Sequence, residues 1–233
     1  MKRAIVILNR LGVNAIDAKT RIGAQINNQG KANNLSHALF LTLVNTLLDF
    51  DGDIYICHPP ITKGEKFKTV TISGRAISCF KSIESVDILA ISRFAIENTI
   101  KLGYDQMILT ASDVPYLTLE YFYKIFYLLN SHEVVLGPAL DHGFNVYGIK
   151  PHVNLDWLYS ENSISRSNGY QLKEEFIENM KKLHINYYID SEVYNDVDTF
   201  EDVLQFYKDY KNGYIKLPSQ LELIKYIENE FFC

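Results

Sequence analysis

The chain has 233 residues, enough for one large α/β domain or two small ones, and 47% hydrophobic with 22% charged residues is ordinary for a folded globular protein. Its formal net charge of −5 argues against a nucleic-acid partner, because binding to a nucleic-acid backbone needs a basic surface. We therefore expect any bound phosphate to be held locally, by loops or by a metal ion.

The three cysteines, Cys57, Cys79 and Cys233, have neither the paired spacing of a zinc site nor the density of a secreted disulfide scaffold. We expect reduced thiols. The apolar run at residues 4–8 is too short for a signal-peptide core or a membrane span. The expected protein is cytoplasmic and has no membrane partner.

The first half of the chain alternates short apolar runs with helical patterns. Residues 4–8 predict a buried strand, and a fourfold apolar spacing then predicts a helix through Leu35, Leu39, Leu43 and Leu47. Residues 53–57 predict a second strand and residues 70–72 a weaker third. A second helix is predicted from Ile88, Ile91, Ala95 and Leu102, and a strand at residues 106–110 follows it.

In the second half, Thr118 is the predicted N-cap of a helix, and residues 134–136 and 145–149 predict two strands that could pair antiparallel. A helix through Leu172, Phe176 and Met180 precedes a strand at residues 185–189. Two final helices are predicted to start at capping boxes, one formed by Thr199 with Asp202 and one by Ser219 with Glu222.

This order of elements predicts an α/β fold, with a mainly parallel sheet and helices on both faces. The composition does not break anywhere along the chain, so one domain is expected over residues 1–211. A hinge near residues 211–218 would then precede a helical tail at residues 212–233.

The most informative motif is Ser112, Asp113, Val114 and Pro115, directly after the strand at residues 106–110. Pro115 cannot extend a strand because it has no backbone N–H. Asp113 is therefore expected at the carboxyl end of a buried strand, the edge where open α/β sheets bind ligands. The alternative is that Asp113 caps the following helix, although Thr118 already offers a cap.

A second motif lies in the loop after the first strand, from Asn9, Arg10 and Gly12 to Lys19 and Arg21. Two cations at this edge of the sheet could neutralise a polyphosphate, Arg21 with a planar fork and Lys19 as a point charge. The glycine spacing of a Walker A loop is absent. An ordinary solvated loop remains the alternative.

Asp196 and Asp198 form a third motif, just before the helix that Thr199 opens. Carboxylates at alternate positions can share a hard divalent cation, and such oxygen ligands suit Mg²⁺ or Mn²⁺. Either aspartate could instead complement the helix dipole or share the cap with Thr199.

A fourth motif is the loop Gly137-Pro138-Ala139-Leu140-Asp141-His142-Gly143, followed by Asn145. Gly143 allows positive φ and a close backbone approach to a ligand, while Asp141 and His142 supply polar groups. A simple hairpin turn would explain the same residues.

Taken together, these four motifs give the chain a resemblance to the nucleotide-diphospho-sugar transferase superfamily, which has the Rossmann-like GT-A fold. The resemblance covers residues 4–203. It is strongest to a bacterial glycosyltransferase-like family and to phospholactate guanylyltransferase. The chain departs from the glycosyltransferase-like pattern at two places: His142 replaces the first glycine of a Gly-Gly pair, and Phe144-Asn145 replaces an aromatic pair. Asn145 instead resembles an asparagine of the guanylyltransferase branch.

The resemblance implies roles for particular residues. Asp113, Asp196 and Asp198 would hold Mg²⁺ or Mn²⁺, and Lys19 and Arg21 would act with Asp113 in catalysis. The nucleotide would contact these two cations and Leu8, Asn9, Arg10, Gly12 and Ser112. The acceptor would contact Asp141, His142, Gly143 and Asn145.

The implied function is a metal-dependent transferase that binds a nucleoside triphosphate or nucleotide sugar together with a small-molecule acceptor. We expect nucleotidyl transfer to a small phosphorylated or acidic acceptor, with release of pyrophosphate, on the strength of Asn145. The alternatives are glycosyl transfer from a nucleotide sugar and an inactive nucleotide-binding or scaffold protein. The aromatic residues of the tail could form the contact of a homodimer. The alternative is that they pack on the domain of their own chain.

Overall fold

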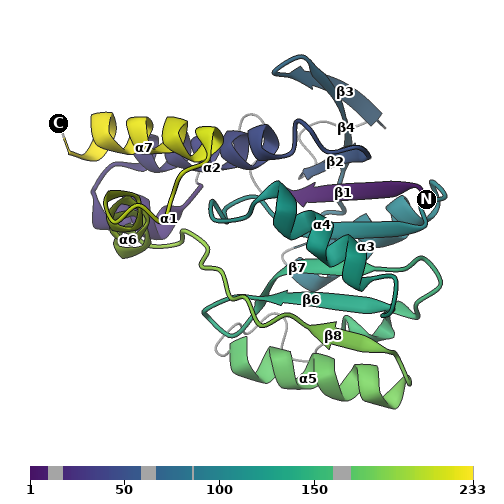
Figure 1. Ribbon diagram of the computed structural model, residues 1–233. Coiled ribbons are helices and arrows are strands. Elements are labelled where there is room, and N and C mark those ends of the chain that lie inside the picture. Colours follow the sequence, from purple (N-terminus) through teal and green to yellow (C-terminus); the bar gives the residue numbers. More distant parts are fainter. Residues whose placement is uncertain (10–17, 59–66, 86, 160–168, 233) are drawn as a thin grey trace.

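A computed structural model describes the chain except residues 10–17, 59–66, 86, 160–168 and 233. In the described part, one sheet has the strand order β3-β4-β2-β1-β5-β7-β6-β8 (Figure 1). Its strands are β1 (Arg3–Leu8), β2 (Asp53–His58), β3 (Phe67–Ile72), β4 (Arg75–Lys81), β5 (Gln106–Ala111), β6 (Val134–Pro138), β7 (Phe144–Ile149) and β8 (Tyr187–Ile189).

The helices are α1 (Thr20–Gln25), α2 (Gln29–Thr46), α3 (Ile88–Ile100), α4 (Leu119–Leu128), α5 (Gly169–Lys182), α6 (Phe200–Lys211) and α7 (Pro218–Phe231), with a short 3₁₀ helix η1 (Leu155–Trp157). None of the helices in the described ranges is long and apolar enough to cross a membrane.

Alternation along β1 explains the two layers of helices. Ile5 and Ile7 face a core that α2 and α4 cover, whereas Val6 faces a core formed with α3, η1 and α5. Because both faces of the strand are buried, its sequence is continuously apolar. The predicted α/β fold, with a mainly parallel sheet and helices on both faces, is confirmed.

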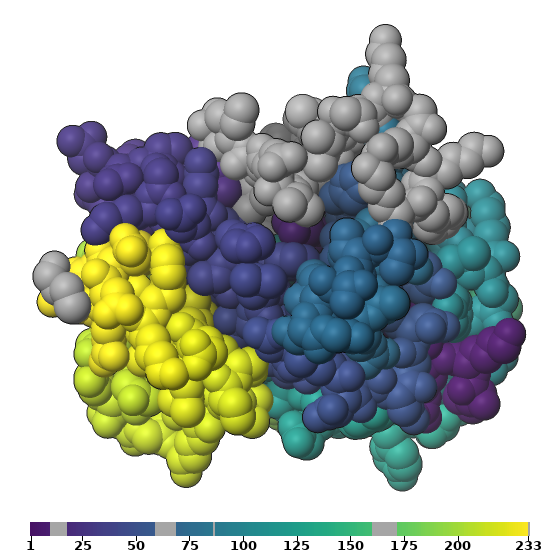
Figure 2. Space-filling view, turned by 90° about the horizontal axis from the view of Figure 1, so that it is seen from above, coloured from purple at the N-terminus to yellow at the C-terminus, as the bar shows by residue number. Residues whose placement is uncertain are grey.

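A third core lies beside the sheet, at the end where β1 finishes. It joins residues of α1, α2, α6 and α7 with Val197 (Figure 1). Figure 2 shows the C-terminal residues, in yellow, against the surface of α2. The tail therefore packs on its own chain, with Leu223, Ile224 and Ile227 buried. The domain boundary near residue 211 stays a prediction.

The parallel pairs place several strand ends at one edge. Leu8 of β1 lies opposite Cys57 of β2 and Ala111 of β5. On its other side, β5 pairs antiparallel with β7. The residues that follow β1 and β5 therefore emerge side by side. This is the edge where the sequence predicts the site.

Several expected elements differ in the structure. β4 was not predicted; it pairs with β3 across a turn at Ser73 and Gly74, where both residues have positive φ. The short helix α1 lies where a loop was expected. Helix α3 ends at Ile100, so Leu102 is exposed rather than helical.

The last helix also begins earlier than its predicted capping box. Pro218 occupies its first position, and the Leu217 backbone N–H donates to Gln220 Oε1. Ser219 instead forms a hydrogen bond with Thr46, and Glu222 pairs with Lys225. The Thr199–Asp202 capping box, by contrast, is present as predicted.

Candidate functional site

Asp113 lies in the turn after β5, and its carboxylate is free of any capping role. Thr118 caps α4 by accepting a hydrogen bond from the Tyr121 N–H, so the alternative role for Asp113 is wrong. Its backbone carbonyl accepts a hydrogen bond from the Val197 N–H at 3.0 Å. That bond joins the Asp113 turn to the segment that carries Asp196 and Asp198.

In the extended segment before α6, successive side chains point to opposite sides. Val197 is buried in the third core, and the aspartates on either side of it point away from that core toward Asp113. Asp202 fixes the end of the segment, because its carboxylate accepts hydrogen bonds from the backbone N–H groups of Asp198 and Thr199.

The three predicted metal ligands do come together. Asp113, Asp196 and Asp198 each offer a carboxylate oxygen within 4.8 Å of the others. Burial, followed by the negative charges of Asp113, Asp198 and Asp141, raises the pKa of Asp196 to about 7. The cluster therefore has an excess of negative charge that favours a bound cation.

Lys19 meets this cluster directly. Its Nζ lies 2.6 Å from Asp113 Oδ2 and 2.7 Å from Asp198 Oδ1, and only 7% of its side chain is exposed. Burial alone would lower the pKa of Lys19, but the ion pairs with Asp113 and Asp198 outweigh burial and raise it. Lys19 is therefore a charged ammonium between two carboxylates.

Arg21 lies at the outer side of the same cluster. Its Nη1 is 3.5 Å from Asp198 Oδ2, and 70% of the side chain is exposed. An exposed, long contact of this kind contributes little to stability, so the fork remains available to a ligand. The structure thus brings Lys19, Arg21 and the three aspartates to one place.

The remaining predicted nucleotide-binding residues lie at the same edge where the structure describes them. Asn9 and Ser112 follow the ends of β1 and β5 and are almost fully buried, and Leu8 is the last residue of β1. Arg10 and Gly12 lie outside the described residues.

The predicted acceptor loop is a hairpin turn between β6 and β7. The antiparallel pairing of these strands is confirmed, and the Ala139 N–H donates to the Gly143 carbonyl. Positive φ was expected at Gly143, yet it falls on His142, with φ at 69°. A non-glycine residue in this region is strained by about 1 kcal/mol. The strained residue, His142, therefore stands where the bacterial glycosyltransferase-like family has glycine.

Asn145 has a structural hydrogen bond. Its Nδ2 donates to the Tyr194 carbonyl at 3.0 Å, and the residue is only 7% exposed. The bond ties β7 to the segment leading to Asp196. Asp141 is exposed and accepts a hydrogen bond from the Gly143 N–H.

Two residues that the sequence reasoning missed lie at the same edge. His58 ends β2, and Ser82 follows β4 with its N–H donating to the His58 carbonyl at 2.7 Å. His58 directly follows the strand predicted at residues 53–57, whereas Ser82 could have been found only by recognising β4, which was not predicted.

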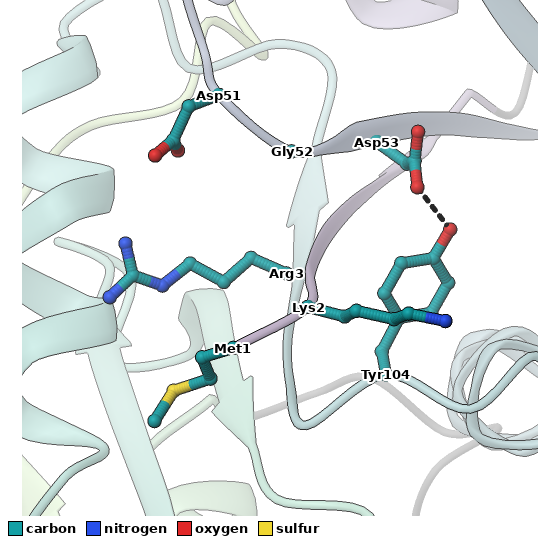
Figure 3. Close-up of a pocket in the computed structure, with 7 residues that line it drawn as sticks. All are labelled: Met1, Lys2, Arg3, Asp51, Gly52, Asp53 and Tyr104. Atoms are coloured by element: carbon teal, nitrogen blue, oxygen red, sulfur yellow. Dashed lines mark hydrogen bonds between the residues drawn. The ribbon is translucent and has the colours of Figure 1, made fainter.

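A hollow of about 270 Å³ lies at the opposite edge of the sheet, where β1 and β2 begin. Figure 3 shows Tyr104 donating a hydrogen bond to Asp53 beside it. The lining residues are Met1, Lys2, Arg3, Asp51, Gly52, Asp53 and Tyr104. This is the amino edge, which in parallel sheets does not carry the ligand, so the hollow is separate from the aspartate cluster.

The sequence matches the model of a protein family over residues 46–166, a family described as an uncharacterized protein conserved in bacteria, DUF2064. The chain belongs to this family. No curated protein matches this DUF2064 member.

Solved structures share the fold of this DUF2064 protein. A Desulfovibrio desulfuricans G20 protein, provisionally named a nucleotide-diphospho-sugar transferase, is similar with a TM-score of 0.79 and 20% identity, over 98% of this chain and 96% of that chain. A CMP:2-keto-3-deoxy-manno-octonic acid synthetase complexed with CTP is similar with a TM-score of 0.53 and 11% identity, over 92% and 100%.

A cytidylyltransferase from Leptospira borgpetersenii is similar with a TM-score of 0.51 and 14% identity, over 98% of this chain and 94% of that chain. At these identities the likeness establishes the fold. The expected resemblance to the nucleotide-diphospho-sugar transferase fold is therefore confirmed, and the neighbours are named as transferases that use nucleotides.

Proposed function

We propose that this protein is a metal-dependent transferase that acts on a nucleotide, and that within this class it is a nucleotidyltransferase. The observation that carries the proposal is the cluster of Asp113, Asp196 and Asp198 with Lys19 between two of its carboxylates. It lies at the carboxyl edge of a sheet whose fold is shared with named nucleotide transferases.

The residues fit a divalent cation. Three carboxylates supply hard oxygen ligands, the kind that Mg²⁺ and Mn²⁺ prefer, and an ammonium group already lies against two of them. When bound, such an ion would neutralise charge on the phosphates of the substrate.

The residues of the chain then have distinct tasks. An oxygen of the acceptor's phosphate or carboxylate forms a bond to the α-phosphorus of the nucleoside triphosphate, while the bond to the bridging oxygen breaks and pyrophosphate leaves with the electron pair. Lys19 and Arg21 supply positive charge for the departing phosphates. Asn9 and Ser112 lie where the nucleotide would contact the strand ends.

Glycosyl transfer is the second candidate. It is supported by the printed name of one neighbour, a nucleotide-diphospho-sugar transferase that shares the fold with a TM-score of 0.79. In addition, the hydrogen bond of Asn145 to Tyr194 gives that residue a structural task, which weakens the argument from Asn145 for nucleotidyl transfer.

The test is turnover of the purified protein with Mg²⁺ or Mn²⁺ against four nucleoside triphosphates and a panel of nucleotide sugars. Small phosphorylated acids serve as acceptors, and pyrophosphate and nucleoside diphosphate are measured separately. We expect pyrophosphate release that requires both metal and acceptor. Nucleoside diphosphate release from a nucleotide sugar would make the protein a glycosyltransferase, and nucleotide binding without turnover would favour the binding or scaffold role.

A further inference from the structure

Lys19 occupies a place that a divalent cation would also need. Its ammonium lies within 2.7 Å of both Asp113 and Asp198, and these two carboxylates with Asp196 form the proposed metal site. Two cations held at the same pair of carboxylates repel each other strongly in a partly buried site. The ammonium and the metal ion therefore cannot both keep their closest contacts.

The backbone of Lys19 is held in place from two sides. The preceding Ala18 N–H donates to Asn33 Oδ1 at 2.8 Å, and Gln29 Nε2 donates to the Ala18 carbonyl. The Lys19 carbonyl accepts the first hydrogen bond of α1, from Gly23. Lys19 itself has left-handed geometry, with φ at 49° and ψ at 47°, which persists only where the surroundings fix it. Movement of the ammonium is therefore a rotation of the side chain.

We propose that Lys19 is an exchangeable counter-ion of the aspartate cluster. In the metal-free protein its ammonium neutralises Asp113 and Asp198; a divalent cation displaces it, and the long side chain then turns toward the phosphates of the nucleotide. The inference rests on the proposed metal site but not on the reaction that the site performs. It explains how one lysine can contact the metal ligands and also serve the substrate.

The first test measures Mn²⁺ binding by calorimetry, without nucleotide, to the wild type and to Lys19→Met. Removal of the competing ammonium is expected to tighten Mn²⁺ binding about tenfold or more. An unchanged or weaker affinity in a folded Lys19→Met variant would overturn the proposal.

Two matched variants separate displacement from a general effect of charge. Lys124 also bridges two carboxylates, Asp190 at 2.8 Å and Glu192 at 2.6 Å, so Lys124→Met is expected to leave Mn²⁺ affinity unchanged. Arg21→Met removes a positive charge near Asp198 without vacating the position between carboxylates, and a smaller gain is expected. Equal gains for Arg21→Met and Lys19→Met would contradict displacement.

The second test uses the wild type, so it does not depend on the folding of a variant. Lys19 is labelled with an amine-reactive acetylating reagent, with and without Mg²⁺, and quantified by mass spectrometry. We expect labelling of Lys19 to rise several-fold with Mg²⁺ while that of Lys124 stays constant. Saturation with Mg²⁺ that leaves Lys19 labelling unchanged would overturn the proposal. Neither test contains a nucleotide, so failure of the transfer assay alone would reject the proposed function and leave this inference standing.

Discussion

Asp196 is the carboxylate of the cluster whose ionisation the fold opposes. Burial and the charges of Asp113, Asp198 and Asp141 raise its pKa to about 7, whereas an aspartate in an unfolded chain has a pKa of about 4. Between these values the folded protein binds more protons than the unfolded chain. The contribution of Asp196 to the free energy of unfolding therefore falls as pH rises from about 4 to about 7.

The variant Asp196→Asn tests this contribution. We expect the metal-free variant to be about 1–3 kcal/mol more stable than the wild type at about pH 8, and the difference to shrink toward about pH 4, because the wild-type carboxyl is then protonated. Urea denaturation in EDTA at several pH values measures it. The same difference at every pH would contradict the assigned ionisation.

At the residue scale, the sequence predicted which side chains meet but not how they pair. Asp113, Asp196 and Asp198 were predictable because strand ends and alternate positions in an extended segment follow from local patterns. The ion pair of Lys19 with two of them was not, since it joins residues 94 and 179 positions apart. The positive φ at His142 was missed because glycine adopts positive φ most readily, so it was expected at the neighbouring Gly143 instead.

At the element scale, Arg75 holds the connection between α2 and β2. Its Nη1 donates to the carbonyls of Leu47, Leu48 and Phe50 at 3.0, 2.6 and 2.7 Å, and its Nη2 donates to Gly52. These carbonyls follow a helix end, where backbone acceptors lack partners within the helix, and the Leu47 carbonyl also accepts a hydrogen bond from the Phe50 N–H.

Replacement of Arg75 is expected to affect stability alone. Arg75→Met should lower the free energy of unfolding by about 2–3 kcal/mol, because the carbonyls lose a charged donor. The matched control is Arg93→Met, which removes exposed ion pairs with Glu97 and Asp156 and should cost less than about 1 kcal/mol. Chemical denaturation compares the two. A loss for Arg75→Met no larger than for Arg93→Met would contradict the bracing role.

Elements with clear periodicity were predictable from the sequence, and elements defined by their partners were not. The buried strands β1 and β5 and the helix α4 have patterns that local rules identify. β4 depends on its pairing with β2 and β3, which no local pattern reveals. The start of α7 was missed because the helix begins at Pro218, before the predicted capping residue Ser219.

At the scale of the whole molecule, the C-terminal helix α7 packs against the segments that carry the aspartate cluster. Val197, between Asp196 and Asp198, shares one core with Leu223 and Ile224 of α7. In addition, Gln220 Nε2 donates to the Pro115 carbonyl at 3.0 Å, two residues after Asp113. Both segments that carry the aspartates are therefore in contact with α7.

If α7 is part of the domain, truncation of one of its buried side chains must destabilise the whole protein. Leu223→Ala is expected to cost about 2–5 kcal/mol in a single unfolding transition, because Leu223 is 1% exposed. The exposed Lys225→Ala on the same helix should change stability by less than about 0.5 kcal/mol. A separate early transition for Leu223→Ala would instead indicate an independent tail, as the predicted boundary near residue 211 implies.

The central claim is that the aspartate cluster serves metal-dependent transfer from a nucleotide, and Asp113→Asn tests it most directly. The measurement is Mg²⁺-dependent release of pyrophosphate or nucleoside diphosphate by the wild type, by Asp113→Asn and by Asp105→Asn, whose aspartate lies at the opposite edge beside Lys2. We predict turnover in the wild type and in Asp105→Asn, and a loss of about 10²–10³-fold in Asp113→Asn with the fold retained. Equal turnover in the wild type and Asp113→Asn would contradict the account.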